Sequence, residues 1–573
     1  MVASRSARHE RSRPPALGVS GGASIGVMTP PGFRGTFRED DDARGVYSEA
    51  AGIARAVPRA VAVPADAADV VALATWAYTT HTPLIPRGAG SSMAGAVIGD
   101  GVIVDLSRMT TIGSVDPASK RVWVGPGAVR DAVNTAANAR GLWFPVDPSS
   151  GAWATIAGMV STNAAGPHSL QLGAMRKWVT ALDCVFDDGS RATIRRGAEL
   201  PTQARTVAAI RRFTTQAMST IFTTAMAEPI ARIRHAGVRK ESSGYALVDF
   251  ARSGDLVDLL VGSEGTLALI VGVELQLLEL PGGRTSLCAG FPTLEAAVEA
   301  ATRAAGLGAA TCELLDRTFL ELVRTSGSAG GVAEDVEALL LVDAEAANQR
   351  DADTRATAIT QVFESLGATG VTRASTPDAI TALWHIRHAA SPILATMTSV
   401  GVSMQFIEDG AVPPAALPEY VRGVRAILDH HGFPGVIFGH AGDANVHVNP
   451  LVDVTKAGWR NRVEAALNEV VTLTAVLGGT LAGEHGDGRL RTPFMHRIWA
   501  NDAIVLFELV KRCFDPRGIF NPGVKVALPG QQPLGDIKYD PALPPLSPSA
   551  RRALDVVSEQ RAYGRFRLEM LEG

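Results

Sequence analysis

The sequence predicts an α+β protein with two successive domains, because one strand-and-helix rhythm occurs twice along a long chain. In residues 47–280, short β-branched runs alternate with Ala-rich stretches of helical length and with glycine turns. The rhythm resumes over residues 285–501. A chain of 573 residues with 46% hydrophobic content also exceeds one ordinary hydrophobic core.

The expected elements of the first domain follow one another closely. Strands and helices are expected to alternate over the runs 58–64, 67–80, 83–86, 102–106, 122–124 and 129–140. In the second domain, helices are expected at 293–307 and 351–366, and strands at 338–342 and 402–406. These patterns favour a sheet covered by helices on one face.

Charge and cysteine content exclude several classes of protein. The 54 basic and 58 acidic side chains give a net charge of -4, so no positive field favours nucleic acid. The four cysteines form no CxxC pair, which argues against iron–sulfur or zinc–thiolate sites and a disulfide framework. We find no secretory signal and no run long enough to span a bilayer. A cytoplasmic protein is expected, with peripheral membrane association as the alternative.

A glycine-rich loop over residues 86–95 follows a short apolar run. It has the sequence Pro-Arg-Gly-Ala-Gly-Ser-Ser-Met-Ala-Gly, and its backbone amides could bind a pyrophosphate. A nicotinamide-type GxGxxG motif is the rival interpretation, but Met93 occupies the position of its third glycine. Taken alone, the loop is equally compatible with a structural turn.

Two later segments are also crowded with small residues. The first covers 147–168 and the second is Gly-Ser-Glu-Gly-Thr-Leu at 262–267, directly before an apolar strand. Backbone without large side chains can lie against a flat ligand, because a Cβ would hold it away. The three segments together indicate a site for a large planar cofactor.

In these segments and their order, the chain resembles the FAD-binding oxidoreductases of the vanillyl-alcohol oxidase and p-cresol methylhydroxylase type. The resemblance covers residues 37–526 and implies a two-part FAD-binding domain plus an α+β substrate (cap) domain with a helix-covered antiparallel sheet. Some relatives attach FAD to a histidine of the first loop, whereas Ser91 and Ser92 follow Gly90 here, so noncovalent FAD is expected. The residues expected to bind FAD are Arg87, Gly88, Ala89, Gly90, Ser91, Ser92, Gly95, Asp147, Pro148, Ser149, Ala154, Thr155, Gly158, Ser161, Asn163, Gly166, His168, Glu264, Gly265, Thr266, Leu267 and Asn521.

This resemblance sets the expected domain boundaries. Residues 46–280 are expected to form the FAD-binding domain and 281–500 the substrate domain. Residues 501–528 return to the FAD-binding domain. The ends are a partly disordered N-terminal extension, 1–45, and a Pro-rich tail, 529–573, with a short helix at 549–572.

Two histidines, His440 and His447, lie on a predicted hairpin. If Asp443 and Ala444 form a two-residue loop, His440 falls opposite His447 with the Cβ atoms ~5 Å apart, and Asn449 lies on the same face. Glu484, in a glycine-rich loop, offers a carboxylate. Two histidines and one carboxylate can hold a catalytic divalent metal, although histidines also occur satisfied within sheets. Zinc is expected first, with manganese or iron as alternatives.

These motifs are similar to those of the D-2-hydroxyacid dehydrogenase branch, which acts on D-lactate, glycolate or D-2-hydroxyglutarate. The resemblance implies a metal on His440, His447 and Glu484, with Asn449 touching substrate and His485 as the base. Arg387 matches the branch's carboxylate-binding arginine, although His388 replaces the acid that usually follows it. Ala444 replaces a glycine, and at ~1 kcal/mol for a positive φ the tight hairpin is expected to relax.

The run 405–413 resembles long relatives that append a cysteine-rich iron–sulfur domain, which is not expected in this chain. Electrons would then leave to an electron-transfer flavoprotein, a quinone, a cytochrome or an iron–sulfur subunit. A homodimer is left open.

The expected reaction is the oxidation of a 2-hydroxy acid to a 2-oxo acid by hydride transfer to FAD. Three alternatives remain: a metal-independent sugar-alcohol or aldonolactone oxidase, a flavin-free metal hydrolase, and a noncatalytic flavin-binding subunit of an electron-transfer complex. The sequence does not rank the hydroxy acids.

Overall fold

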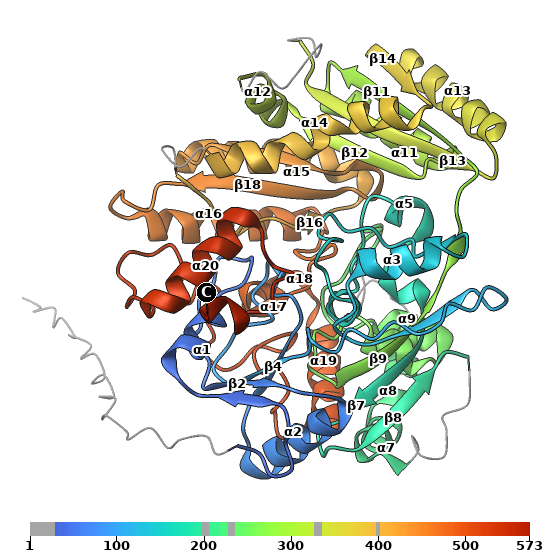
Figure 1. Ribbon diagram of the computed structural model, residues 1–573. Helices are drawn as coiled ribbons and strands as arrows, with labels where there is room; N and C mark the ends of the chain where they lie inside the picture. Colours follow the sequence, from blue (N-terminus) through green and yellow to red (C-terminus); the bar gives the residue numbers. More distant parts are fainter. Residues whose placement is uncertain (1–28, 198–205, 227–234, 326–334, 397–400, 573) are drawn as a thin grey trace, which may run out of the picture.

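The computed structural model describes residues 29–197, 206–226, 235–325, 335–396 and 401–572. Within them the chain forms two four-stranded sheets, an eight-stranded sheet and a two-stranded ribbon of β6 (Leu142–Trp143) and β10 (Leu278–Glu279). Figure 1 shows the large sheet and its helices as an upper layer above the two small sheets. None of the helices described is long and apolar enough to cross a membrane.

The first small sheet has the strand order β1-β2-β4-β3. Its strands are β1 (Thr36–Arg38), β2 (Ala60–Val63), β4 (Val102–Asp105) and β3 (Leu84–Arg87). The last three are parallel, and helix α2 (Ala67–Thr80) packs on them in one hydrophobic core. Because β1 pairs with β2, the first sheet begins at Thr36. This residue lies inside the segment 1–45, which was expected to be a partly disordered extension. Residues 1–28 lie outside the described residues.

The second small sheet is antiparallel, in the order β5-β9-β7-β8. Its strands are β5 (Arg121–Val124), β9 (Leu269–Gln276), β7 (Val179–Val185) and β8 (Arg191–Arg195). The core beneath it also holds α7 (Ala208–Gln216) and α19 (Asn501–Phe514), which comes from near the end of the chain. The chain therefore returns to this region after the large sheet.

The large sheet is antiparallel, as expected, in the order β14-β11-β13-β12-β17-β18-β15, with β16 also paired to β18. The strands are β14 (Thr369–Ala374), β11 (Gly283–Phe291), β13 (Ala338–Ala346), β12 (Thr311–Asp316), β17 (Gly435–His440), β18 (Asn445–Val452), β15 (Val402–Ser403) and β16 (Gly410–Ala411). The strand expected at 402–406 is thus shortened to two residues, because Phe406 and Ile407 leave the ladder to enter the core.

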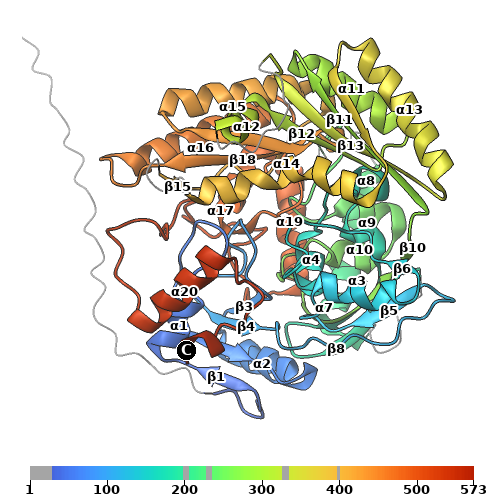
Figure 2. The ribbon, with the colours of Figure 1, turned by 45° about the horizontal axis from the view of Figure 1, so that its top comes forward.

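Helices cover both faces of this sheet. One face packs on α11 (Leu294–Gly306), α13 (Gln349–Ser365), α15 (Leu417–His431) and α16 (Trp459–Val476). The other face packs on α12 (Arg317–Thr325) and α14 (Pro377–Thr396), which Figure 2 shows lying across the strands. The expectation of helices on one face was therefore incomplete, since alternate residues of β12 and β13 are apolar on both sides.

The tail packs on the first small sheet. Helix α20 (Pro548–Gln560) lies beside α1 (Asp41–Val46) in both views. The helix expected at 549–572 ends at Gln560, where Arg561 adopts a left-handed φ of 52°. Leu568 and Met570, beyond the helix, are buried in the same core.

Candidate active site

The glycine-rich loop begins where β3 ends. Arg87 is buried and donates hydrogen bonds to the carbonyls of Tyr47 (3.1 Å) and Glu49 (2.9 Å). A Cβ on Gly88 would lie 2.1 Å from Oγ1 of Thr155, so the loop touches the second predicted segment. Gly90 has a φ of +76° and covers the Arg87 guanidinium closely. Only glycine fits this turn without strain.

The third predicted segment joins the other two. The backbone amide of Glu264 donates to the carbonyl of Ser161 at 2.8 Å. Asn521 Nδ2 donates to the carbonyls of Ala96 (3.0 Å) and Glu264 (2.7 Å) and so links this segment to the first loop. Lys525 Nζ lies 2.9 Å from Oε1 of Glu264. The structure thus brings the three segments and Asn521 together.

Three residues predicted to bind FAD have strong contacts within the protein. His168 lies between Asp147 (Nδ1 to Oδ2, 2.6 Å) and Glu345 of β13 (Nε2 to Oε1, 3.2 Å). Burial alone lowers the pKa of His168, but the two carboxylates raise it to about 10. Asn163 Oδ1 accepts from the amide of Arg176 at 2.9 Å. Asp147 and His168 therefore connect the FAD-binding region to the large sheet.

The remaining predicted residues lie on the same three segments. Gly166 packs against Asp147, where a Cβ would be 2.5 Å from its backbone. Thr266 accepts from Tyr245, and Leu267 is buried in the core of the second sheet. The rest are Ala89, Ser91, Ser92, Gly95, Pro148, Ser149, Ala154, Gly158 and Gly265.

The glycine-rich loop, residues 86–95, has the chemistry of an anion-binding site. The buried Nε of Arg87 and the Oγ of Ser92 have no hydrogen-bond partner among the described residues. Unpaired buried donors cost about 1–3 kcal/mol each, so a ligand that accepts hydrogen bonds is expected to stabilise this loop. A cofactor diphosphate fits these donors.

The histidine hairpin has a different register from the predicted one. Asn445, not His447, lies opposite His440, while His447 lies opposite Phe438. A turn over Ala441–Asp443 followed by Ala444 replaces the two-residue loop. The turn is thus longer than predicted, but Ala444 still adopts a left-handed φ of 54°, so the backbone cost expected at this position remains. The two imidazoles meet diagonally on one face, with their Nε2 atoms 3.3 Å apart.

Three ligand atoms converge at this point. Oε1 of Glu484 lies 3.1 Å from Nε2 of both His440 and His447. His447 Nδ1 faces the carbonyl of Glu408 at 2.9 Å, which can only accept a hydrogen bond, so this nitrogen carries the proton. His440 Nδ1 faces the carboxylate of Glu313 at 2.5 Å. Both Nε2 lone pairs therefore point toward the carboxylate, an arrangement that fits a divalent cation.

Buried charges surround this cluster. Lys240 Nζ lies 2.6 Å from Oε2 of Glu484. Although burial raises the pKa of Glu484, Lys240 and His440 hold it well below its usual range. Burial lowers the pKa of His440, but Glu313 and Glu484 raise it to about 9. Without a metal, His440 thus holds a proton in the place of a cation.

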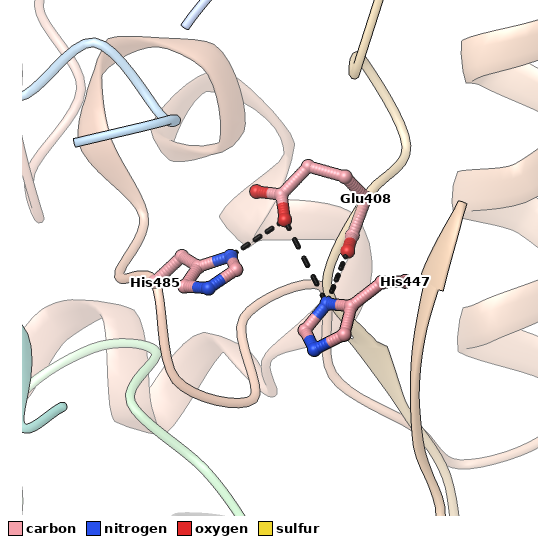
Figure 3. Close-up of side chains that lie close together, drawn as sticks. All are labelled: Glu408, His447 and His485. Carbon is pink, nitrogen blue, oxygen red and sulfur yellow. Dashed lines mark hydrogen bonds and ion pairs between the residues drawn. The ribbon is translucent and has the colours of Figure 1, made fainter. Parts of the chain in front are cut away.

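His485 is positioned by Glu408, as Figure 3 shows. Glu408 Oε2 lies 2.5 Å from His485 Nδ1 and 3.9 Å from His447 Nδ1. Burial lowers the pKa of His485, whereas Glu408 and Asp409 raise it to about 9. Glu408, His447 and His485 could also hold a metal by proximity, but Nδ1 of His447 donates to the Glu408 carbonyl. Nε2 of His485 remains the nitrogen that faces Glu484, at 3.7 Å.

Arg387 and Asn449 come from different elements, α14 and β18. Arg387 Nε donates to Oε2 of Glu313 at 2.9 Å, and its guanidinium stacks on Phe438, 4.5 Å from the ring centroid. Arg387 is thus joined to His440 through one carboxylate. Asn449 is buried on β18, two residues beyond His447. The side chain of His388 lies outside the described residues.

Sequence reasoning missed Lys240, Glu313 and Glu408 as members of the site. Glu408 lies in the run 405–413, which resembles that of long relatives, and this resemblance is the signal that could have indicated the acid. Lys240 and Glu313 stand in no motif, and only long-range packing brings them to the histidines. A cleft of about 630 Å³ reaches this cluster, lined by Arg239, Lys240 and Gly483 among others.

Two protein-family models match the chain. The FAD binding domain matches residues 58–195, and the C-terminal domain of FAD linked oxidases matches residues 280–524. The chain belongs to the FAD-linked oxidases. The prediction of an FAD-dependent oxidoreductase is confirmed, and the alternative of a flavin-free hydrolase is wrong.

Similar proteins place this FAD-linked oxidase in the D-2-hydroxyacid branch. It is 27% identical to the glycolate oxidase subunit GlcD of Bacillus subtilis over 85% of this chain and 93% of that protein. It is 28% identical to a D-lactate dehydrogenase of Archaeoglobus fulgidus over 81% and 90%. A D-2-hydroxyglutarate dehydrogenase of Escherichia coli matches at 29%, over 82% of this chain but 48% of its own length.

Solved structures support the fold. The 4-ethylphenol oxidase of Gulosibacter chungangensis superposes with a TM-score of 0.62 at 14% identity, covering 86% of this FAD-linked oxidase and 94% of that chain. An alkyldihydroxyacetonephosphate synthase gives a TM-score of 0.57, also at 14% identity, with 85% and 82% covered. The predicted fold class is confirmed.

Proposed function

We propose that this enzyme oxidises a D-2-hydroxy acid to the 2-oxo acid, with a divalent metal on His440, His447 and Glu484. The observation that carries the proposal is the convergence of two Nε2 atoms and a carboxylate at 3.1–3.3 Å beside the FAD segments. Glu264 of the third segment accepts from the amides of Asp487 (2.7 Å) and Gly488 (3.0 Å), just after Glu484. The names of the relatives supply the substrate class.

The chain's own residues have distinct parts in this reaction. Arg387 would pair with the substrate carboxylate. Asn449 would touch the substrate. His485 would accept the hydroxyl proton at Nε2 in its neutral form, in which Nδ1 keeps its proton toward Glu408. Because the pKa of His485 is raised to about 9, the rate of flavin reduction should rise with pH toward that value. When bound, FAD supplies the acceptor for the hydrogen and two electrons that leave C2, and the metal supplies a Lewis acid for the hydroxyl.

The finer assignments follow from the same residues. Zinc is proposed first because two imidazoles and one carboxylate suit it, with manganese or iron as alternatives. Noncovalent FAD is proposed because serines follow Gly90. An electron-transfer flavoprotein, a quinone, a cytochrome or an iron–sulfur subunit would accept the electrons. We keep a cytoplasmic location, with peripheral membrane association as the alternative.

One observation favours a metal-independent oxidase as the second candidate. Lys240 Nζ lies 2.6 Å from Oε2 of Glu484, so this carboxylate already has a cationic partner within the protein. Such an enzyme would oxidise a sugar alcohol or aldonolactone. If oxidation of D-2-hydroxy acids survives complete removal of metal, this candidate replaces the first.

Anaerobic mixing with a panel of D- and L-2-hydroxy acids tests the proposal through bleaching of the flavin. Bleaching by one D-acid class supports it; bleaching by none, with FAD bound, contradicts it and favours a noncatalytic flavin subunit. His485→Ala should slow flavin reduction roughly 10²–10⁴-fold while FAD stays bound. His496→Ala, on helix α18 (Met495–Ile498), is the matched control. Unchanged reduction in His485→Ala would refute the base.

A further inference from the structure

The C-terminal tail lies against the glycine-rich loop, outside both matched family regions. Arg567 Nη2 donates to the carbonyl of Ala89 at 3.3 Å. Tyr563 packs on Trp153 of the second FAD segment, with ring centroids 6.0 Å apart, and Arg561 lies 5.1 Å from the Trp153 ring. One short stretch of tail therefore touches two of the three FAD segments.

The tail packs into a hydrophobic core and does not lie only on the surface. Leu568 and Met570 share a core with Tyr47, which ends α1, and with Ile85 and Ile103 of the first sheet. Helix α20 packs on α1, where a Cβ on Gly45 would lie 2.8 Å from Cβ of Ala550. Figures 1 and 2 both show α20 beside α1. These contacts fix the backbone that carries Arg567.

Arg567 is a buried cation without an acid partner among the described residues. It is 3% exposed, and Nη1 donates to the carbonyls of Ala562 (3.2 Å) and Arg565 (3.0 Å). Its Nε is buried with no acceptor among the described residues. Burial and the neighbouring Arg87 lower the pKa of Arg567 to about 10. Arg87 likewise has a buried Nε without an acceptor.

Two adjacent buried guanidinium groups repel each other and lose hydration. The buried carboxylate of Asp105, which raises the pKa of both, can balance only one of the two positive charges, so a further anion is expected to stabilise the pair. The neighbouring loop offers backbone amides and the unpartnered Oγ of Ser92. FAD carries two negative charges on its diphosphate and none on its flavin ring. The diphosphate is the part of FAD that matches these charges.

We propose that the tail forms one wall of the FAD site and that Arg567 binds the cofactor's diphosphate together with the loop 86–95. This inference rests on FAD binding and not on the identity of the hydroxy acid. The tail would thus make cofactor retention depend on the last residues of the chain.

Titration of the full-length apoprotein with FAD, followed by flavin fluorescence, tests the proposal. Arg567→Gln should raise the Kd for FAD at least tenfold, and Arg567→Lys, which keeps the charge, should recover part of that loss. Arg565→Gln, an exposed arginine two residues away, is the matched control and should leave the Kd unchanged. Riboflavin, which has no phosphate, should bind the wild type and Arg567→Gln equally.

The outcomes separate the possibilities. An unchanged Kd for FAD in Arg567→Gln overturns the proposal, as does an equal loss with riboflavin, which indicates a structural role. Circular dichroism of the apoprotein shows whether Arg567→Gln folds; if it does not, Arg567→Lys and the dependence of the wild-type Kd on salt decide. Wild-type protein that binds FAD but oxidises no hydroxy acid would contradict the proposed function alone.

Discussion

The two halves of the active site carry opposite imbalances of buried charge. Beside the glycine-rich loop, the buried Arg87 and Arg567 donate to backbone carbonyls and, for Arg567, to Sδ of Met570, and one buried carboxylate, Asp105, faces the two cations. Around the histidine hairpin, acids outnumber the fixed cations. The acids are Glu313, Glu408, Asp409 and Glu484, and the cations are Lys240, Arg387 and Arg491.

This difference in buried charge indicates which kind of ligand each half requires. Buried charges persist only when paired, so the loop region needs an anion and the hairpin region needs a cation or a proton. A dinucleotide diphosphate and a divalent metal satisfy these needs separately. Variants at one half should therefore leave ligand binding at the other half unchanged.

The largest effect is expected from His447→Ala, which removes one of the three ligands. We expect hydroxy-acid-driven flavin reduction to fall about 10³-fold, because a catalytic metal contributes several kcal/mol. FAD content should remain at the wild-type level. Stopped-flow absorbance and metal analysis measure the two quantities. His430→Ala, an exposed histidine away from the active site, is the control. If His447→Ala lost FAD to the same extent as it lost metal, the two halves would not bind their ligands independently.

Glu313→Gln tests how the histidine-hairpin half, which is expected to bind a cation, depends on the residue that orients its ligands. Glu313 accepts from His440 Nδ1 and from Arg387 Nε, and it orients both. We expect roughly 10–100-fold weaker metal binding, as for other residues that orient a ligand. Competition with a chelator measures this affinity. Glu337→Gln, which loses its ion pair with Arg425 elsewhere, should bind metal normally. Normal metal affinity in Glu313→Gln would show that Glu313 serves only the fold.

Arg87→Met tests the half beside the glycine-rich loop, which is expected to bind an anion. Loss of this buried charge should weaken FAD binding by about tenfold, the effect of one hydrogen bond to a charged group. Metal content should not change. Arg59→Met, which breaks a surface pair with Asp100, serves as the control in the same fluorescence titration. Loss of metal in Arg87→Met would mean that the two halves fold as one unit.

The last prediction concerns the link between the halves, His168, whose loss should change the stability of the fold and not the binding of either ligand. Its folded pKa of about 10 exceeds the unfolded value near 6.5, so its stabilisation is complete below pH 6.5 and is lost as pH rises through 10. His168→Gln should cost roughly 1–3 kcal/mol at pH 6 and little at pH 10. Thermal unfolding from pH 6 to pH 10 measures the difference in stability between the wild type and His168→Gln. A purely steric role of His168 would leave this difference the same at every pH.

Much of the site could be predicted because it depends on local spacing. The glycines of the first loop and the histidines of the hairpin stand close together in the chain, so the backbone alone limits where they lie. The register of the hairpin could not be predicted, since a two-residue and a longer loop fit the same letters. Burial of Ala444 and pairing of His440 with Asn445 decided it.

The sequence by itself determined the fold class, because the alternation of strands and helices is a short-range pattern. It also predicted the three FAD segments and the candidate metal ligands, from small and ligating residues together with a family resemblance. Only the tertiary structure placed Lys240 and Glu313 beside the histidines and Arg567 beside the glycine-rich loop. These residues lie far from their partners along the chain. Their meeting depends on how separate sheets and the tail pack, which no local pattern encodes.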